Sequence, residues 1–548
     1  MATTRLGERL LASLGKLQAA PICFELAQDV PKGGVLCAVP ALLAFGLLRH
    51  QLETFSLPAG YYPIEAIFLS IAFLALARVK SVEALRYQPP GEWGKIIGLD
   101  RIPEVRTLRK KIDLLCRGGG EQVRQWSGQL AREWMEADPQ SAGCLYVDGH
   151  IRVYNGTLTQ LPRRYVARQR ICLRGTTDYW VNAMDGQPFF VVTQAVDPGL
   201  RKVLETEIIP RLLQEVPGQP TPEQLEADPQ LARFTVIFDR EGYSPELFAR
   251  LWALRIAVIS YRKFVQRPWS PKDFTSHKVR LVNGEEVEMA LAERRVPLRN
   301  GLRVREIRRR TPDGHQTSII STNNDKPLET IAATMFARWC QENFFQYMGQ
   351  HYGLNRLVEY GTEPLPDTTL VVNPAWRRKD QEVRRERALL LKEQAQFGAL
   401  TSPPQAQPHE LSRFEQQKGQ LLEQIENREQ KLNQLKAERK SILRQVTLKD
   451  LPKAERFTQL STAKKHFVDT IKLIAYRAET ALVHIVREKL QREDDARALV
   501  RQVFGATVDL CPDLQQKILR VRLHQLTTPA HAQILEHLCA ELTAWAWR

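Results

Sequence analysis

Cysteine is scarce in this sequence, and no two cysteines form a Cys-x-x-Cys pair. The eight cysteines stand at isolated positions, so neither a zinc module nor a disulfide framework is expected. The longest apolar stretch, residues 66–77, is too short for a bilayer, which needs about 20 residues. The first residues do not have the pattern of a signal peptide. These absences predict a reduced, cytoplasmic protein with no membrane partner.

Several motifs of nucleotide-binding and hydrolytic enzymes are also missing. No Ser-His-Asp order, Walker phosphate loop or Gly-x-Gly-x-x-Gly fingerprint stands out. Positive charge is abundant instead: the formal net charge is +16, and arginine-rich runs recur at 163–174, 303–310 and 377–387. One such run is often only a solvated surface. Several runs with a large positive total favour a polyanionic partner, and nucleic acid in particular.

Two apolar runs each end in an aspartate. Asp148 ends a run that begins at residue 144, and Asp239 ends a continuous run at 234–238 that is typical of a strand buried on both faces. After Asp239 a glycine turns the chain and a capped helix is predicted to begin at Ser244, so we expect a strand–turn–helix unit. Functional sites in open α/β sheets lie at the carboxyl ends of strands. Either aspartate alone fits a turn residue equally well.

Glu342 lies in a third segment, which has helical periodicity. On a helical wheel of 3.6 residues per turn, apolar residues before and after it fall within about 60° of its direction. They are Leu328, Ile331, Met335, Trp339 and Phe345. We therefore expect the carboxylate to point towards the core. An ion pair with Arg338, four residues earlier, would explain it without a function. Together with the two aspartates, it favours a divalent-metal site for phosphodiester chemistry.

At these segments the chain resembles the insertion-sequence transposases that carry an Asp-Asp-Glu triad on a ribonuclease H-like core. Asp148 matches the first aspartate, and Asp239 matches the second within an Asp-x-x-Gly-Tyr block. Arg338 and Glu342 match the Arg-x-x-x-Glu pair of the last block. The resemblance implies an α/β ribonuclease H-like catalytic core with a β-rich insertion, flanked by all-α N-terminal and C-terminal regions. It also implies a transposase that binds the ends of its insertion sequence, cleaves the strands and joins them to target DNA.

The same resemblance implies cofactors and partners. Asp148, Asp239 and Glu342 would hold two Mg²⁺ ions, with Mn²⁺ as a substitute, and the partner would be double-stranded DNA at the element's ends and at the target. It further implies a homodimer in the synaptic complex and a bacterial, nucleoid-associated protein. In the last block, Met335 stands where the family has a tyrosine, and Gly349 stands where it has a lysine. Two alternatives stay open: a catalytically inactive DNA-binding protein derived from a transposase, and a metal-dependent nuclease without strand transfer.

A basic helix is predicted at 104–116, after a short helix at 92–99 and a turn, with the spacing of a helix-turn-helix. One face of this helix is apolar and the other cationic, as a groove-binding helix requires. An ordinary amphipathic helix is the alternative. The candidate DNA-binding residues are Arg106, Arg109, Lys110 and Lys111 in this helix, Arg308, Arg309 and Arg310 in the β-rich insertion, and Arg338.

Composition and turn signals divide the chain into six predicted regions. These are a helical N-terminal region at 1–135 with the helix-turn-helix-like segment at 92–116, the first part of the core at 140–269, the β-rich insertion at 270–322, the last part of the core at 323–375, a linker and coiled-coil-like arm at 376–450, and a helical C-terminal domain at 451–548. The heptad-like spacing at 411–444 is interrupted by Arg428 and Arg439, so an internal helical hairpin and a dimer seam are equally expected. Asp178 and Asp185 are expected in turns.

Overall fold

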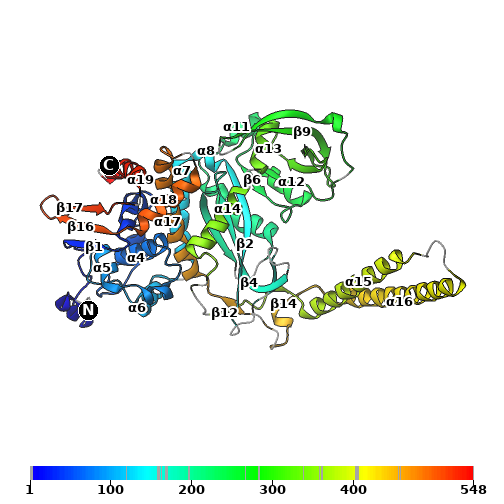
Figure 1. Cartoon of the computed structure of the whole chain (residues 1–548), viewed down its shortest axis with the longest axis horizontal. Coiled ribbons are helices and arrows are strands. Elements are labelled where there is room, and N and C mark those ends of the chain that lie inside the picture. Colours follow the sequence, from blue (N-terminus) through cyan, green and yellow to red (C-terminus); the bar gives the residue numbers. More distant parts are fainter. Residues whose placement is uncertain are drawn as a thin grey trace. The chain divides into compact units, whose positions relative to one another are not determined.

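The continuous apolar runs of the sequence become the central strands of a ten-stranded sheet (Figure 1). Neighbouring strands follow the order β3-β4-β2-β6-β7-β11-β10-β9-β8, and β5 pairs with β4. β2, β6 and β7 are parallel, whereas β2, β4 and β5 are antiparallel. The strands are β2 (Cys144–Val153), β3 (Arg163–Val166), β4 (Ile171–Asn182), β5 (Pro188–Gln194), β6 (Thr235–Phe238), β7 (Ala257–Tyr261), β8 (Thr275–Arg280), β9 (Glu286–Pro297), β10 (Arg303–Arg310) and β11 (Gln316–Ser321).

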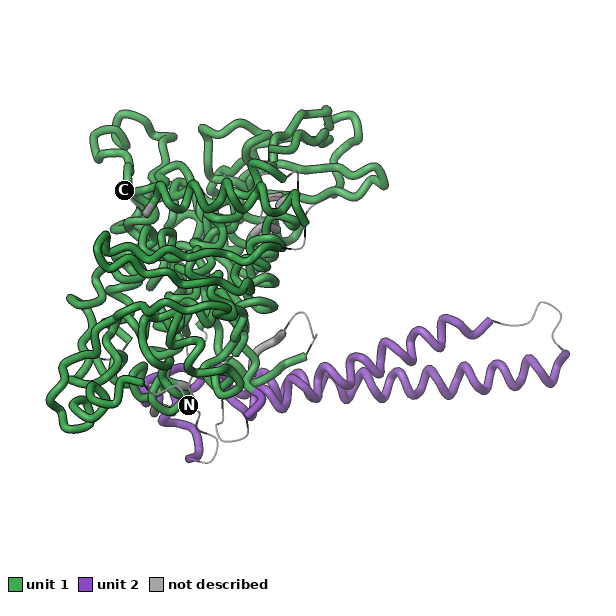
Figure 2. Tube along the Cα trace, turned by 60° about the vertical axis from the view of Figure 1, so that its left-hand side comes forward, with its two compact units in different colours: residues 1–154, 163–361, 460–548 green, residues 155–162, 362–459 purple. Residues whose placement is uncertain are grey.

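This computed structural model describes residues 4–546 except for 119, 157–160, 162, 167–170, 195–197, 266, 282–283, 337–338, 357, 359–361, 402–406, 454–455, 457, 491 and 527. The chain forms two units, coloured separately in Figure 2. The first contains residues 1–154, 163–361 and 460–548, and the second contains residues 155–162 and 362–459. The large sheet belongs to the first unit.

Strands occur throughout the region predicted as a β-rich insertion, but they do not form a sheet of their own. β11 pairs antiparallel with β7, with Ile319 opposite Tyr261, and β10, β9 and β8 follow as a meander. The main sheet therefore continues into this region. Arg308, predicted to contact DNA, is 1% exposed and donates to Glu306 at 2.8 Å, so that prediction is wrong for this side chain.

Helices cover the sheet and build the rest of the first unit. They are α1 (Leu6–Ser13), α2 (Val39–Ala44), α3 (Gln51–Thr54), α4 (Ile64–Leu76), α5 (Pro90–Ile96), α6 (Val105–Leu115), α7 (Gly120–Ala137), α8 (Pro139–Ala142), α9 (Leu200–Val203), α10 (Ile209–Glu215), α11 (Pro222–Ala227), α12 (Pro245–Ala253), α13 (Leu328–Phe336), α14 (Trp339–Tyr347), α17 (Ala463–Arg487), α18 (Glu493–Gly505) and α19 (Pro529–Ala546). Short 3-10 and π turns join several of them, including η2 (Val82–Tyr87) and η5 (Met348–Tyr352). α17 is buried along almost its whole length.

The flanking regions are not all-α, contrary to the expectation. β1 (Ala27–Val30) pairs antiparallel with β16 (Val508–Asp513), which in turn pairs with β17 (Ile518–Leu523). This three-stranded sheet joins the N-terminal and C-terminal regions, because its strands come from both. Their short lengths and mixed burial explain why the sequence does not identify them.

The second unit is dominated by a pair of long helices, α15 (Pro374–Ala399) and α16 (Pro408–Ser441). Val383 and Leu390 of α15 pack against Ile425 and Leu432 of α16. Figure 2 shows the two helices side by side in the second unit. The heptad-like seam of α16 is therefore covered by α15 of the same chain, as in the hairpin alternative. Two-stranded sheets, β12 (Thr362–Pro364) with β15 (Thr458–Leu460) and β13 (Leu370–Val372) with β14 (Gln445–Thr447), adjoin the helices in sequence.

Candidate active site

Asp148 and Asp239 lie at matching positions on neighbouring parallel strands. β2 and β6 pair in parallel with Tyr146 opposite Ile237. Extending this register by two residues places Asp148 beside Asp239, and strand alternation puts both side chains on the same face as Tyr146 and Ile237. Both aspartates are half-buried. Two carboxylates that are far apart in sequence thus come together where the parallel pairing of β2 and β6 ends. Asp239 follows the last residue of β6, whereas Asp148 lies within β2, which continues to Val153.

The turn after β6 fixes the backbone around Asp239. Asp239 Oδ1 accepts a hydrogen bond from the backbone N–H of Glu241 at 2.7 Å, and Ser260 Oγ donates to the Asp239 carbonyl oxygen at 3.1 Å. A Cβ at Gly242 would lie 2.4 Å from the ring of Phe238, so the chain reverses there only with glycine. Asp148 Oδ1 accepts from the backbone N–H of Gly149 at 2.9 Å. Both carboxylates are therefore held by local backbone donors.

α13 covers the sheet face that carries the two aspartates. The Tyr146 hydroxyl donates to the Thr334 carbonyl oxygen at 2.5 Å. Ile331 and Met335 pack in one cluster with Tyr146 and Ile237. Because Asp148 and Asp239 follow Tyr146 and Ile237 by two residues, α13 packs on the face to which their side chains point.

α14 packs on the neighbouring part of the same face (Figure 1). Gln341 Nε2 donates to Asn182 Oδ1 at 2.8 Å. The rings of Phe344 and Phe345 lie 5.4 and 6.1 Å from that of Trp180, which is directly opposite Asp148 in the β2–β4 register. The helix that carries Glu342 is therefore anchored beside Asp148.

Glu342 itself is exposed, so the expectation that its carboxylate points into the core is wrong. Within α14 the side that faces the sheet contains Gln341, Phe344 and Phe345, all buried, and Glu342 lies next to that side. The wheel drew residues 328–345 as one helix, whereas the structure has two, α13 ending at Phe336 and α14 beginning at Trp339, so the apolar residues of α13 do not define the buried side of α14. A buried glutamine with an amide partner also gives no apolar signal in the sequence.

His150 connects the site to the segment that follows α14. It lies two residues after Asp148 on the same face, and its ring stacks on Phe345 with centroids 4.9 Å apart. His150 Nε2 lies 2.5 Å from Asn355 Oδ1. Neither Asn355 nor its neighbour Arg356 has a spacing or composition that would have singled it out in the sequence.

A buried ion pair next to the site was also missed. Asp178, predicted in a turn, is fully buried in the middle of β4 and opposite His150 in the register. Its carboxylate accepts from Arg152 Nη2 at 2.7 Å, and Arg152 is 2% exposed. The sequence contained one signal for this ion pair. Arg152 is four residues after Asp148 in β2, so both side chains must lie on one face of the strand.

A second buried carboxylate fixes the end of α14. Glu479 of α17 is fully buried and accepts hydrogen bonds from Tyr347, from Tyr352 and, at 2.7 Å, from Arg78. Burial disfavours its ionised form, but Arg78 and the two hydroxyl donors outweigh burial and lower the pKa of Glu479. This network ties α17, α4's C-terminal end and the turn η5 together.

The remaining DNA-binding candidates have varied environments. Arg106, Arg109 and Lys110 of α6 are exposed, Lys111 is half-buried, and Arg109 pairs with Glu83. Arg309 and Arg310 at the end of β10 are half-buried. Arg338 lies outside the described residues.

Hard oxygen ligands suit Mg²⁺, so the carboxylates of Asp148 and Asp239 on neighbouring strands fit such an ion. Among the described residues, the metal-type side chains whose ligand atoms all lie within 4.8 Å of one another are Asp29, Asp509 and His524. Asp148, Asp239 and Glu342 do not form a set of that kind. In the group of Asp29, Asp509 and His524, His524 Nε2 lies 3.0 Å from Asp509 Oδ1, so these two side chains are hydrogen-bond partners.

A family model described as "Transposase protein" matches residues 1–545, which is nearly the full sequence. No curated protein matches the chain. Among the described residues, no helix combines the length and the apolar character needed to cross a membrane.

Proposed function

The chain belongs to this transposase family, and on that premise we propose that it is an Asp-Asp-Glu transposase with Asp148, Asp239 and Glu342 as its catalytic residues. It would bind the ends of its insertion sequence, cleave the DNA strands and join them to target DNA. The proposal assigns a ribonuclease H-like character to the segment of sheet that contains β5, β4, β2, β6 and β7. Its three antiparallel strands followed by two parallel ones support this assignment.

One observation carries the proposal: the register that places Asp148 beside Asp239, with the Glu342 helix packed on the same face. A pair of half-buried carboxylates on neighbouring parallel strands is costly unless a cation or a proton neutralises it. Glu342 is exposed at the edge of this face. Its approach to the two aspartates when DNA is bound is part of the proposal.

The residues would divide the work as follows. Asp148 and Asp239 would hold two Mg²⁺ ions, with Glu342 as the third protein ligand and Mn²⁺ as a substitute. When bound, the ions supply Lewis-acid activation of the attacking oxygen and neutralise charge on the leaving oxygen. His150 would orient water or phosphate beside Asp148, since Asn355 and Phe345 fix its ring. Exposed Arg106 and Lys110 would neutralise DNA phosphates, which makes binding weaken steeply with salt.

The test is cleavage of DNA that carries the element's own ends, by wild type and by Asp148→Asn, Asp239→Asn and Glu342→Gln. Each substitution should lower Mg²⁺-dependent cleavage by more than about 100-fold, because even the loss of an outer-shell partner of a metal ligand costs about 10–100-fold. End binding, measured by fluorescence anisotropy, should stay near wild type. Asp313→Asn, in the exposed turn between β10 and β11, is the matched control and should cleave normally.

The products distinguish the alternatives. Joined products on paired ends would support a transposase, whereas cut ends that are never joined would identify a nuclease without strand transfer. Binding without cleavage in both Mg²⁺ and Mn²⁺ would identify a catalytically inactive DNA-binding protein. Near-normal cleavage by one of the three variants would remove that residue from the site.

A further inference from the structure

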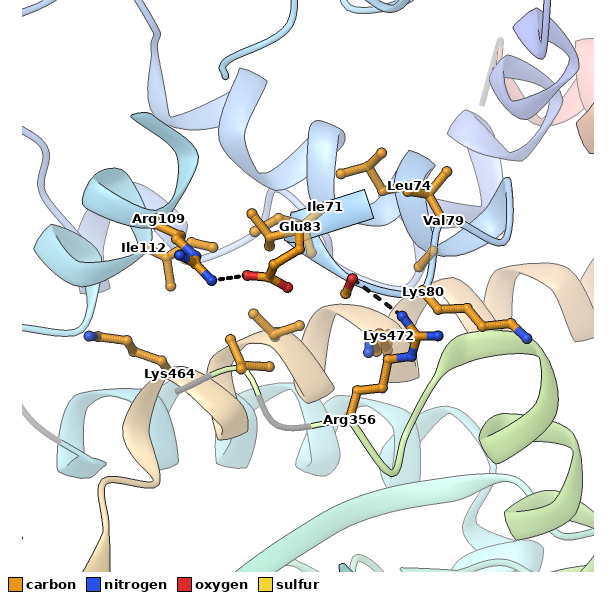
Figure 3. Close-up of a pocket in the computed structure, with 15 residues that line it drawn as sticks. Ile71, Leu74, Val79, Lys80, Glu83, Arg109, Ile112, Arg356, Lys464 and Lys472 are labelled. Atoms are coloured by element: carbon orange, nitrogen blue, oxygen red, sulfur yellow. Dashed lines mark hydrogen bonds and ion pairs between the residues drawn. The ribbon is translucent and has the colours of Figure 1, made fainter. Parts of the chain in front are cut away.

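A cavity of about 340 Å³ lies in the first unit, between the end of α4, α6, α17 and the segment that follows η5 (Figure 3). Its volume falls within the range of small-molecule sites. Apolar side chains, among them Ile71, Leu74 and Val468, form much of its wall. Cationic side chains surround the same space, so the cavity combines an apolar interior with a strongly positive boundary.

The cations at its two ends differ in whether they are neutralised. Arg109 and Lys464 lie at one end in Figure 3, and they pair with Glu83 and Asp113. At the other end lie Lys80, Arg356 and Lys472. Within the described part of the chain these three have no carboxylate partner, and Arg356 donates only to Ser81 Oγ, at 3.4 Å. One end of the cavity therefore has three cationic side chains without an ion-pair partner among the described residues.

Lys472 is the decisive residue of this group. It belongs to α17, lines the cavity and is only 6% exposed. Among the described residues it has no hydrogen-bond or ion-pair partner. A buried ammonium group without a partner is unfavourable, and its retention points to an anion that binds there. Burial, reinforced by nearby Lys465, lowers the pKa of Lys472 to about 7.

The cavity adjoins the proposed catalytic centre through a short chain of contacts. Arg356 follows Asn355, whose Oδ1 lies 2.5 Å from His150 Nε2, and His150 follows Asp148 by two residues on the same face. Close packing fixes this segment: Gly353 has φ 64°, and a Cβ there would lie 2.9 Å from the backbone oxygen of Lys80. An anion held by Arg356 would thus lie one residue along the chain from the Asn355–His150 contact beside Asp148.

We propose that this cavity binds one nucleoside phosphate, with its base and sugar against the apolar wall and its phosphate against Lys472, Arg356 and Lys80. The inference rests on the proposed function, because DNA at the neighbouring site makes a nucleoside phosphate the amphipathic anion that is present. A nucleoside phosphate of this chemistry can come from two sources. It can be an unpaired terminal nucleotide of a DNA strand, or a free nucleotide.

Calorimetric titration of the full-length protein tests the free source, with deoxyadenosine 5′-monophosphate, deoxyadenosine and inorganic phosphate as probes. A duplex with 2-aminopurine as its unpaired terminal nucleotide tests the DNA source by fluorescence. Lys472→Met and Arg356→Gln should each weaken binding of the monophosphate or of the duplex end, whichever the wild type binds, about tenfold or more. This is the loss expected for one charge-assisted hydrogen bond. Lys489→Met, an exposed lysine just beyond α17, is the matched control and should bind as wild type.

Binding of the monophosphate, weakened by both variants, supports a free nucleotide. A fluorescence change with the duplex alone, lost in both variants, supports the strand end. Arg356 is exposed, so its variant tests the cavity even if Lys472→Met fails to fold. Equal affinity for inorganic phosphate and for deoxyadenosine 5′-monophosphate overturns the inference. It is also overturned if the monophosphate does not bind and the duplex gives no fluorescence change. Glu342→Gln should retain nucleotide binding without cleavage, so failure of the proposed chemistry and failure of this inference give different results.

Discussion

The two long helices α16 and α17 both carry charged residues where a helix interface is expected. The helices differ in how far these charges are buried and in whether each has a partner. On α16, Arg428 pairs with Glu386 and Glu393 of α15, and Arg439 pairs with Asp380; the two arginine side chains are 26% and 33% exposed. On α17, Lys465, Asp469, Lys472, Arg477 and Glu479 are buried. A charge near water loses little hydration, whereas a buried one must find partners or remain unfavourable.

The buried charges of α17 separate into paired and unpaired ones. Lys465 pairs with Asp469, and Glu479 is bound by Arg78 and two tyrosines. Lys472 has no such partner among the described residues. Whether a buried charged side chain has an ion-pair or hydrogen-bond partner, rather than its burial alone, therefore distinguishes a structural charge from a candidate ligand site. Three substitutions test this difference between the two helices.

The largest effect is expected for Glu479→Gln. The substitution removes the negative charge but leaves Arg78, whose side chain is 18% exposed, without its counter-charge. Breaking a buried ion pair in this way costs about 3–5 kcal/mol. Urea unfolding followed by circular dichroism should show this loss for Glu479→Gln. Glu438→Gln on α16, where the partner is Lys379 at the surface, is the matched control and should lose less than about 1 kcal/mol. Equal losses in the two variants would remove the distinction between the helices.

Sequence reasoning reached the strands of the site but not its surroundings. The runs that end at Asp148 and Asp239 are strands, and they could be predicted because the apolarity of a strand is a local pattern in the sequence. The order of the strands is set by their pairing. The orientation of Glu342 depends on α14 being a separate helix from α13, which one helical wheel drawn through both does not contain. The cavity beside Lys472 could not be predicted either, because residues of α4, α6 and the segment after η5, all distant in sequence, line it together with Lys472.

Asp178 shows the same limit within a strand. Its position in the sequence resembles a turn, yet Arg152 on the neighbouring strand neutralises it inside the sheet. A one-residue difference in register would have separated the two side chains onto opposite faces. Charged residues in a strand can therefore be placed only after the register is known.

An effect of opposite sign is expected for Lys472→Met. The pKa of Lys472 falls from the ordinary 10.5 to about 7, so protonation of the folded state opposes stability. Below pH 7 both folded and unfolded states bind the proton and the full penalty applies, on the order of a few kcal/mol. Between about pH 7 and 10.5 the unfolded state alone keeps the proton, so stability rises with pH. Lys472→Met should therefore be more stable than wild type at pH 6, with a difference that shrinks towards pH 10.

Unfolding free energies at pH 6, 8 and 10 measure this difference, and the comparison requires protein free of bound anions. The groups that act on Lys472 are Lys465 and Asp469 of α17, Arg356, and Arg152 of β2, and all remain in the variant. Lys489→Met should match wild type at each pH. A variant that is less stable than wild type at pH 6 would show that Lys472 has a stabilising partner, which would remove the basis for an anion site.

The smallest effect is expected for Arg428→Gln on α16. The guanidinium donates to Glu386 and Glu393 at 2.7 Å each, but the exposure of its side chain, 26%, keeps water close to all three groups. Such networks contribute up to about 1 kcal/mol and are screened by salt, since the Debye length is about 3 Å at 1 M. The loss should therefore be measurable at low ionic strength and vanish in 1 M salt, whereas the gain from Lys472→Met should persist there because its cause is desolvation. If the Arg428 effect resisted salt, the α15–α16 interface would be drier than its exposure indicates, and the two helices would differ in pairing alone.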